Sequence, residues 1–207
     1  MSFVQLQVIS SYSLLQSTIT IEELVIKAKE RGYQAIALTD YNILYGMVDF
    51  YKMCQKHQIK PILGLTLDVE GIVNTNENHA ILLLAKNAKG YESLMTLSSE
   101  KMLLAENERL TVEQIKKHSQ NLIALTPGEK GEIEHFLLQN ETESAAKVTE
   151  KWRDAFPERH FYLGIQLHQK LEPIKDDLQA LATNTGTLTV ALQDVRYIDA
   201  TDDFSTT

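Results

Sequence analysis

Residues 35–69, AIALTDYNILYGMVDFYKMCQKHQIKPILGLTLDV, contain the pattern that decides the fold. A short apolar run, Ala35 to Thr39, has the length of a buried strand, and a second such run follows at Pro61 to Val69. Between them, Met47 to His57 places apolar and aromatic side chains at helical spacing. Two strands joined by a helix predict parallel pairing through a right-handed crossover, which is the repeating unit of α/β proteins.

The same alternation extends over the whole chain. It predicts further strands at Phe3 to Ile9, His79 to Ala85, Leu122 to Leu125, Phe161 to Ile165 and Leu188 to Ala191. It predicts helices at about Thr20 to Arg31, Tyr91 to Leu104, from Thr111 onward, Ile133 to Leu138, Ser144 to Phe156 and Ile174 to Thr185. These roughly seven strand-then-helix units fit an α/β barrel and an open doubly wound sheet equally well. Because no linker interrupts the pattern, we expect one domain over residues 1–207.

Two of the helix starts carry a capping-box pattern. Thr20 precedes Glu23, and Thr111 precedes Gln114, at the spacing that lets the two side chains satisfy each other's backbone amides. We therefore expect helices to begin directly after Thr20 and Thr111.

The composition predicts a soluble, cytoplasmic protein. The 20 Lys and Arg against 28 Asp and Glu give a net charge of -8, which argues against a broad positive surface for nucleic acid. Cys54 is the one cysteine, which excludes an internal disulfide, and its helical context favours a buried thiol. No apolar run approaches the roughly 20 residues that span a bilayer, so no membrane partner is expected.

Functional side chains of α/β folds gather where the strands end. Here the strand ends carry mainly polar residues that the fold would bring around one cleft: Gln5, Gln7, Asp40, Tyr41, Thr66, His79, the loop Thr126 to Gly131, Asp194 and Arg196. Within and after that loop, Glu129 to Glu132 look like a solvated turn.

Three stretches carry a resemblance to a known family. They are residues 3–65, which begin with FVQLQVISSYSLL and end with KPILGL, LLLAKNAKGYESLMTLSS at 82–99, and the end of the chain at Leu192 to Ile198. Together they resemble the N-terminal PHP (polymerase and histidinol phosphatase) domain of bacterial DNA polymerase III alpha subunits. The resemblance implies a distorted (β/α)₇ TIM-like barrel whose intact members hold up to three metal ions and hydrolyse phosphoesters. It also implies that the chain is an N-terminal fragment of a larger replicative polymerase.

Most of the metal ligands that the resemblance implies are replaced in this chain. The family's His-x-His pair aligns with Gln5 and Gln7, and an amide oxygen is a poor ligand for zinc or manganese beside imidazole or carboxylate. The other replaced ligands are the histidine at Tyr41, the glutamate at Thr66, the cysteine at Gly128 and the last histidine at Arg196. Asp40, His79 and Asp194 keep ligand chemistry, so we expect a vestigial cleft with no metal and no catalytic residue.

Arg196 suggests how such a cleft could be stable. Without metal ions, the carboxylates of Asp40 and Asp194 lack cations, and a guanidinium could bridge them by charge-assisted hydrogen bonds. The sequence thus predicts a structural or partner-binding domain, whose partners are the remaining polymerase domains, replisome proteins and, through the parent enzyme, DNA. The parent polymerase would use Mg²⁺, whereas this domain would use no cofactor.

Alternatives remain at this point. One is an active metal-dependent phosphoesterase, either a 3′-5′ exonuclease or a pyrophosphatase. In a second, Asp40 and Asp194 form a weak Mg²⁺ site. In a third, an unrelated α/β barrel enzyme resembles the polymerase by chance.

Overall fold

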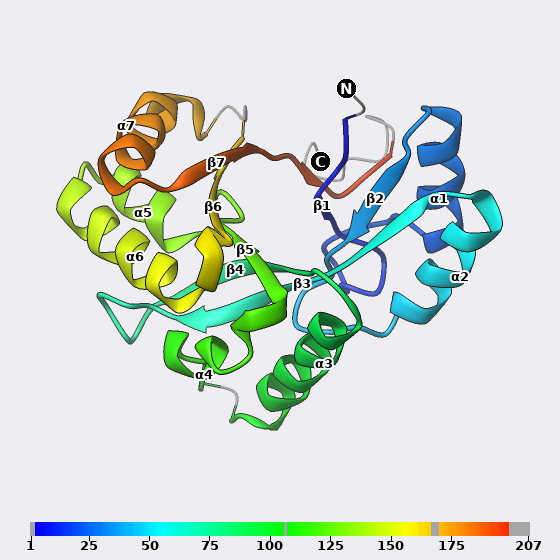
Figure 1. Cartoon of the computed structure of the whole chain (residues 1–207), viewed down its shortest axis with the longest axis horizontal. Coiled ribbons are helices and arrows are strands. Elements are labelled where there is room, and N and C mark those ends of the chain that lie inside the picture. Colours follow the sequence, from blue (N-terminus) through cyan, green and yellow to red (C-terminus); the bar gives the residue numbers. More distant parts are fainter. Residues whose placement is uncertain (1–2, 106, 167–169, 199–207) are drawn as a thin grey trace.

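A computed structural model describes residues 3–105, 107–166 and 170–198. Its elements, shown in Figure 1, are β1 (Gln7–Val8), α1 (Ile21–Glu30), β2 (Ala35–Leu38), α2 (Met47–His57), β3 (Lys60–Glu70), β4 (Asn78–Ala85), α3 (Ala88–Leu103), α4 (Val112–Lys116), β5 (Leu122–Leu125), α5 (Glu132–Leu138), α6 (Thr142–Ala155), β6 (Phe161–Ile165), α7 (Lys175–Thr185), β7 (Leu188–Ala191) and β8 (Asp194–Val195). Short 3₁₀ turns lie at Ser119–Asn121, Pro157–Arg159 and Glu172–Ile174.

The strands form a curled sheet with the helices on its outer side (Figure 1). Six strands hydrogen-bond in the order β2-β3-β4-β5-β6-β7, and β1 pairs with β8. A parallel bridge between Gln5 and Ile36 connects β1 to β2, while β7 leads directly into β8. The expected α/β barrel is therefore confirmed as a curled half-barrel, and the open doubly wound sheet is not what forms.

The expectation of parallel pairing throughout is wrong for β4. This strand runs antiparallel to β3 and to β5, whereas the other paired strands are parallel. The loop from Gly71 to Glu77 is too short to contain a crossover helix, so β3 and β4 can only form a hairpin. Because β4 is reversed, its first residues, Asn78 and His79, lie beside the last residues of β3.

The first predicted strand is shorter than expected. The sequence pattern runs from Phe3 to Ile9, but regular pairing covers only Gln7–Val8, with an isolated bridge at Gln5. Strand β1 meets β8 on one side and the start of β2 on the other, and both neighbours are themselves short. Because both neighbouring strands are short, only a few residues of β1 find backbone hydrogen-bond partners, and the strand is short too.

Both capping boxes form as predicted. The Thr20 side chain accepts a hydrogen bond from the amide of Glu23, whose carboxylate accepts one from the Thr20 amide. Thr111 and Gln114 make the same reciprocal pair at the start of α4. Each box contributes about 1 kcal/mol by satisfying amides that the first helical turn leaves unpaired.

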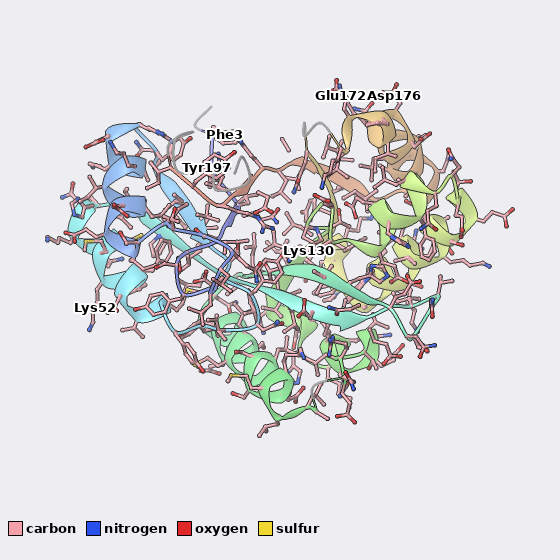
Figure 2. The ribbon with its side chains drawn as sticks, turned by 180° about the vertical axis from the view of Figure 1, so that it is seen from behind. Phe3, Lys52, Lys130, Glu172, Asp176 and Tyr197 are labelled. Atoms are coloured by element: carbon pink, nitrogen blue, oxygen red, sulfur yellow. The ribbon has the colours of Figure 1, made fainter. Side chains whose placement is uncertain are left out.

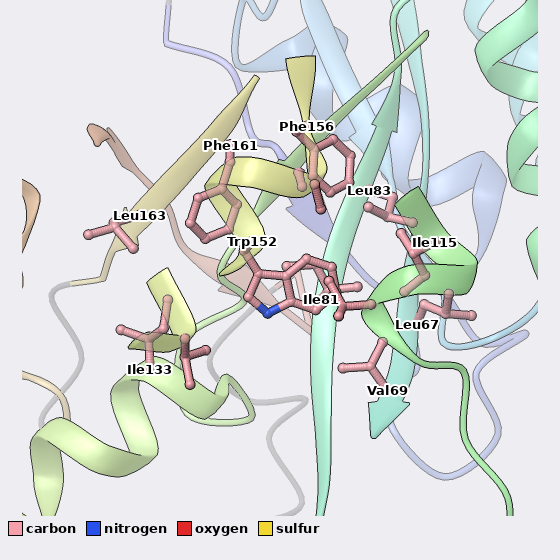
Figure 3. Close-up of a cluster of buried hydrophobic side chains, with 14 of the residues drawn as sticks. Leu67, Val69, Ile81, Leu83, Ile115, Ile133, Trp152, Phe156, Phe161 and Leu163 are labelled. Carbon is pink, nitrogen blue, oxygen red and sulfur yellow. The ribbon is translucent and has the colours of Figure 1, made fainter. Parts of the chain in front are cut away.

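The largest apolar core lies between the sheet and helices α3 to α7, and Figure 3 shows part of it. Trp152 of α6 stacks on Phe161 of β6, with ring centroids 6.5 Å apart and an interplanar angle of 22°. A second cluster joins β1 and β2 to α1 and α2, and it contains Cys54, where burial raises the pKa of the thiol to about 12. The buried structural thiol expected at this position is thus confirmed. No helix in the described ranges has the length and apolar character that crossing a membrane requires.

Replacing Leu67 of β3 with Ala should lower the free energy of unfolding by about 3 kcal/mol, because a fully buried side chain leaves a cavity. The matched control is Leu103→Ala, where 86% of the side chain is exposed and the loss should stay below about 0.5 kcal/mol. Urea denaturation of both variants measures the difference. Equal losses would contradict this assignment of the core.

Candidate functional site: a cleft with replaced metal ligands

The candidate site lies at the end of the sheet where the parallel strands finish. Asp40 and Tyr41 follow β2, Thr66 lies in β3, the loop 126–131 follows β5, and Asp194 lies in β8. His79 reaches the same end only because β4 is antiparallel. The structure therefore brings together strand ends that the sequence places far apart, as expected.

Asp40 is the central buried carboxylate of this cleft. Its Oδ1 accepts hydrogen bonds from the Ser10 amide at 2.7 Å and the Ser13 hydroxyl at 2.8 Å. Its Oδ2 accepts one from the Ser10 hydroxyl at 2.7 Å. Burial, with only 1% of the residue exposed, raises the pKa of Asp40, and the hydrogen bonds from both serines oppose that rise. Both carboxylate oxygens are thus already engaged by the chain itself.

Gln7 is fully buried and is held by an amide network. Its Nε2 donates to the Pro127 carbonyl at 3.2 Å, and its Oε1 accepts from Gln166 Nε2 at 2.9 Å. Gln166 also donates to the Pro127 carbonyl, at 3.0 Å. Sequence reasoning missed Gln166, although its position directly after β6 is the signal that could have found it. Gln5 lies at the edge of this network, with its Nε2 at 3.5 Å from Gln193 Oε1.

Gly128 has no side chain to offer, and its position favours glycine. Its φ of +85° lies in the left-handed region, where other residues are strained. A Cβ there would lie 2.5 Å from Gln166 Oε1. The loop can therefore pack against Gln166 only without a cysteine or other side chain at this point.

Arg196 holds the second retained carboxylate. Its Nε and Nη2 both donate to Asp194 Oδ2, at 2.8 and 2.7 Å. The expected bridge from Arg196 to both carboxylates does not form, because Ser10 and Ser13 satisfy Asp40 instead. Asp194 Oδ1 is buried and has no hydrogen-bond partner in the described part of the chain.

Tyr41 lies between positively charged groups. The Lys130 Nζ is 4.1 Å from its ring centroid, and its hydroxyl interacts with Arg196. Burial is the largest cause that raises the pKa of Tyr41, and the charge of Asp194 adds to it. Burial likewise lowers the pKa of Lys130, helped by the nearby charge of Arg196. Tyr41 is thus a protonated phenol that packs under a lysine, not a metal ligand.

Thr66 serves the sheet and not the cleft. Its hydroxyl donates to the Thr39 carbonyl at 2.8 Å, and the residue forms a parallel bridge with Tyr41. Thr66 is fully buried. The position of the implied glutamate is therefore occupied by a hydroxyl that is bound to the main chain.

His79 lies at the rim, in a cavity of about 550 Å³. Its Nε2 is 3.4 Å from Glu77 Oε2, and its ring centroid is 5.2 Å from that of His135. Burial lowers the pKa of His79, while the charge of Glu132 opposes that shift, so the neutral imidazole is favoured near neutral pH. The sequence did not predict that His135, in α5, would lie beside His79.

Glu134 is a buried acid that sequence reasoning missed. It is fully buried under the loop 126–131, and burial raises the pKa of its carboxyl to about 7. Neither of its carboxylate oxygens has a hydrogen-bond partner among the described residues. Glu132 is buried too, not solvated as expected, because its carboxylate accepts hydrogen bonds from the amides of Ile72 and Val73. No signal in the sequence separates these two glutamates from exposed ones.

The residues present do not fit a metal cluster of the PHP type. The Asp40 oxygens are occupied by serines, Asp194 is paired with Arg196, and the Gln7 amide is bound to Pro127 and Gln166. Within residues 3–105, 107–166 and 170–198, no three His, Cys, Asp or Glu side chains are arranged to hold a metal ion. The chain's own hydrogen bonds have taken over the groups that ions would need.

Comparisons with known proteins give a consistent result. The profile of the family described as "PHP domain" matches residues 5–168. DNA polymerase III subunit alpha of Bacillus subtilis is 37% identical over 203 residues, which cover 98% of this chain and 18% of that protein. The same subunit of Aquifex aeolicus is 32% identical over 226 residues, covering 99% of this chain and 19% of that protein. The chain thus spans about a fifth of the length of these relatives.

Solved structures with little sequence identity share the fold. An amidohydrolase from Chromobacterium violaceum, solved with bound sulfate and no metal, has a TM-score of 0.59 at 14% identity, over 96% of this chain and 89% of that chain. A two-domain protein from Bacteroides vulgatus, containing a predicted PHP-like metal-dependent phosphoesterase, has a TM-score of 0.57 at 10% identity, over 96% of this chain and 53% of that chain. These likenesses support the architecture alone.

Arg196→Ala should lower the free energy of unfolding at neutral pH by about 1 to 3 kcal/mol, because Asp194 would keep a partly buried charge without a partner. Adding Asp194→Asn to that variant should recover part of the loss, since the uncompensated charge is then gone. Thermal and urea unfolding of the two variants measure both effects. An unchanged midpoint for Arg196→Ala would refute the stabilising role of this pair.

Glu134→Gln should change how stability depends on pH. The folded-state pKa of about 7 exceeds the usual 4.5, so the folded chain retains a proton that the unfolded chain releases. Stability should therefore fall as pH rises through this window, by up to about 3 kcal/mol. The free energy of unfolding of the variant should not fall over this pH range, and at pH 8 it should be higher than that of the wild type. Glu143→Gln, at an exposed position of α6, is the control and should follow the wild type.

Proposed function

The chain belongs to the PHP domain family, and we propose that it is the N-terminal PHP domain of a DNA polymerase III alpha subunit whose metal-dependent hydrolysis has been lost. The relatives named above support the polymerase context, because the match extends over nearly the whole chain. The domain would then act as a structural or partner-binding part of a cytoplasmic DNA-directed DNA polymerase. Nucleotide addition with Mg²⁺ would belong to parts of the polymerase outside these residues.

The observation that supports the proposed loss of hydrolysis is that the polar groups in the cleft form hydrogen bonds with one another. Phosphoester hydrolysis by a metal cluster needs several strong ligands around each ion, with open positions for water and substrate. Gln5, Gln7, Tyr41, Thr66, Gly128 and Arg196 supply none of those ligands at the replaced positions. The two retained aspartates accept hydrogen bonds from serines or from arginine.

The charge of the chain supports contact with proteins over direct contact with DNA. A net charge of -8 gives no general attraction for a polyanion, and Lys130 and Arg196 lie close to Asp194 and Tyr41. The partners we propose are therefore the remaining polymerase domains and replisome proteins, while DNA would be held through the parent enzyme.

Metal analysis combined with hydrolysis assays tests this proposal. The purified chain should contain less than stoichiometric zinc and manganese by plasma mass spectrometry after dialysis. It should not hydrolyse bis(p-nitrophenyl) phosphate, pyrophosphate or single-stranded DNA when Mn²⁺ or Zn²⁺ is added. The control for contaminating nucleases is Asp40→Asn, purified in parallel.

Stoichiometric metal together with activity that Asp40→Asn abolishes would overturn the proposal. That result would establish the rival function, an exonuclease or pyrophosphatase. Activity that is equal in both preparations would come from a contaminant and would leave the chain itself inactive, as proposed.

A further inference from the structure

A second cavity lies at the opposite end of the sheet from the cleft. It has a volume of about 990 Å³ and is bordered by the first residues of β3, β5 and β6 and the last residues of the reversed strand β4. Helix α2 and the start of α3 complete its rim. We call this cavity and its rim the apolar mouth.

The wall of the apolar mouth is formed by side chains that the barrel itself leaves partly uncovered. Leu6, Ile62, Ile123, Tyr162 and Val190 point into the barrel around a small core cluster and are each only partly buried. A soluble chain that leaves this many adjacent apolar side chains open usually covers them with another surface.

The apolar surface continues outward along α2. Val48 is 55% exposed and Tyr51 is 48% exposed, and both line the mouth. The cavity therefore combines a pocket for anchoring side chains with an exposed apolar shelf, formed by Val48 and Tyr51, on its helical side. Aromatic and aliphatic anchors that fill a pocket dominate the energetics of protein interfaces.

The rim is positively charged in a chain that is acidic as a whole. Lys52 and Lys60 line the mouth, and no carboxylate of the described residues forms a salt bridge with either. Figure 2 shows Lys52 at the outer edge of the molecule, on α2, away from Lys130 of the loop 126–131. None of the described residues that line the mouth is Asp or Glu. A third lysine, Lys86, is 3.5 Å from Glu158.

The start of α3 adds to the positive electrostatic potential at the rim. Asn87 caps the helix, and Asn87 and Ala88 both line the mouth. The first turn of α3 contains no acidic residue, so the positive end of its dipole is not compensated there. Lysines on α2 and β3 and the start of α3 thus present positive charge from three elements around one apolar surface.

We propose that the apolar mouth docks a segment of a partner protein that combines apolar anchor side chains with Asp or Glu residues. A peptide segment fits better than a small amphiphile, because Val48 and Tyr51 are exposed at the edge of the cavity and the positive groups are distributed over three elements. Small-ligand pockets span roughly 300–1,000 Å³, and this cavity, at about 990 Å³, lies at the upper end of that range. The docking site does not depend on the inactivity of the cleft.

Selection from a phage-displayed peptide library tests this proposal. The 207-residue chain serves as the target, and the library presents random peptides long enough for about four helical turns. The selected peptides should combine Leu, Ile or Phe with Asp or Glu. The best peptide is then synthesised with a fluorescent label, and its affinity is measured by anisotropy.

The variants separate charge and apolar contributions. Lys52→Glu with Lys60→Glu should weaken binding about tenfold, because the charges that attract the acidic residues are reversed. The matched control is Lys29→Glu with Lys147→Glu, which changes the net charge equally at exposed sites outside the mouth and should leave the affinity unchanged. Ile62→Arg should block binding. If that variant fails to fold by circular dichroism, the two charge-reversed proteins decide the result.

Several outcomes would overturn the proposal. The first is that the selected peptides contain no excess of acidic residues. The second is that the two charge-reversed proteins lose affinity for the peptide equally. The third is that a folded Ile62→Arg variant still binds the peptide. If no peptide binds but dodecyl sulfate displaces anilinonaphthalene sulfonate from the protein, the mouth is a site for small amphiphiles instead. A concentration-dependent dimer in light scattering that the Lys52 and Lys60 changes abolish would show that a second copy occupies the mouth.

Discussion

Compensation of buried negative charge is the constraint on which this structure depends. A carboxylate removed from water is strongly destabilised unless donors or cations surround it. The fold buries Asp40 and compensates it with Ser10 and Ser13, so the segment after β1 is tied to the end of β2. Asp194 is compensated by Arg196, which is only two residues further along the chain. The contacts of Asp40 connect the segment after the first strand to the body of the sheet, whereas the Asp194–Arg196 pair lies within the last strand and the residue after it.

The same constraint opposes the binding of a cation in this cleft. A cation entering between the aspartates would compete with the serine hydrogen bonds to Asp40 and with the Arg196 hydrogen bonds to Asp194 Oδ2, which leaves Asp194 Oδ1 for it. It would also add a positive charge beside Arg196 and Lys130, where burial and the charge of Arg196 already lower the pKa of the lysine. Replacing one glutamine by histidine would restore one ligand but would leave this network in place. The hydrogen bonds of the folded cleft thus oppose coordination as much as the missing ligands do.

The sequence predicts the class of fold well, because it follows from local patterns, and the same patterns place the polar strand ends near one another, although Thr66 turns out to serve the sheet. Apolar runs locate β2 to β7, and polar residues at their ends locate Asp40, His79 and Asp194. The direction of β4 depends on the length of the loop before it, which an apolar run does not encode. The partners of Asp40 are serines from the segment after β1, and the burial of Glu134 depends on how α5 packs under the loop 126–131. Such contacts between distant segments have no periodicity to reveal them.

The two ends of the sheet differ in the kind of group that they leave without a partner. At the cleft, Asp40 and Gln7 have hydrogen-bond partners within the chain, whereas Asp194 Oδ1 is buried without one among the described residues. At the other end, Ile62 and Tyr162 stay partly uncovered, and Lys52 has no salt-bridge partner among the described residues. Binding free energy comes from groups that are unsatisfied before the partner arrives, because satisfied groups must first lose their existing contacts. The end opposite to the cleft therefore offers the larger uncovered apolar surface to a partner.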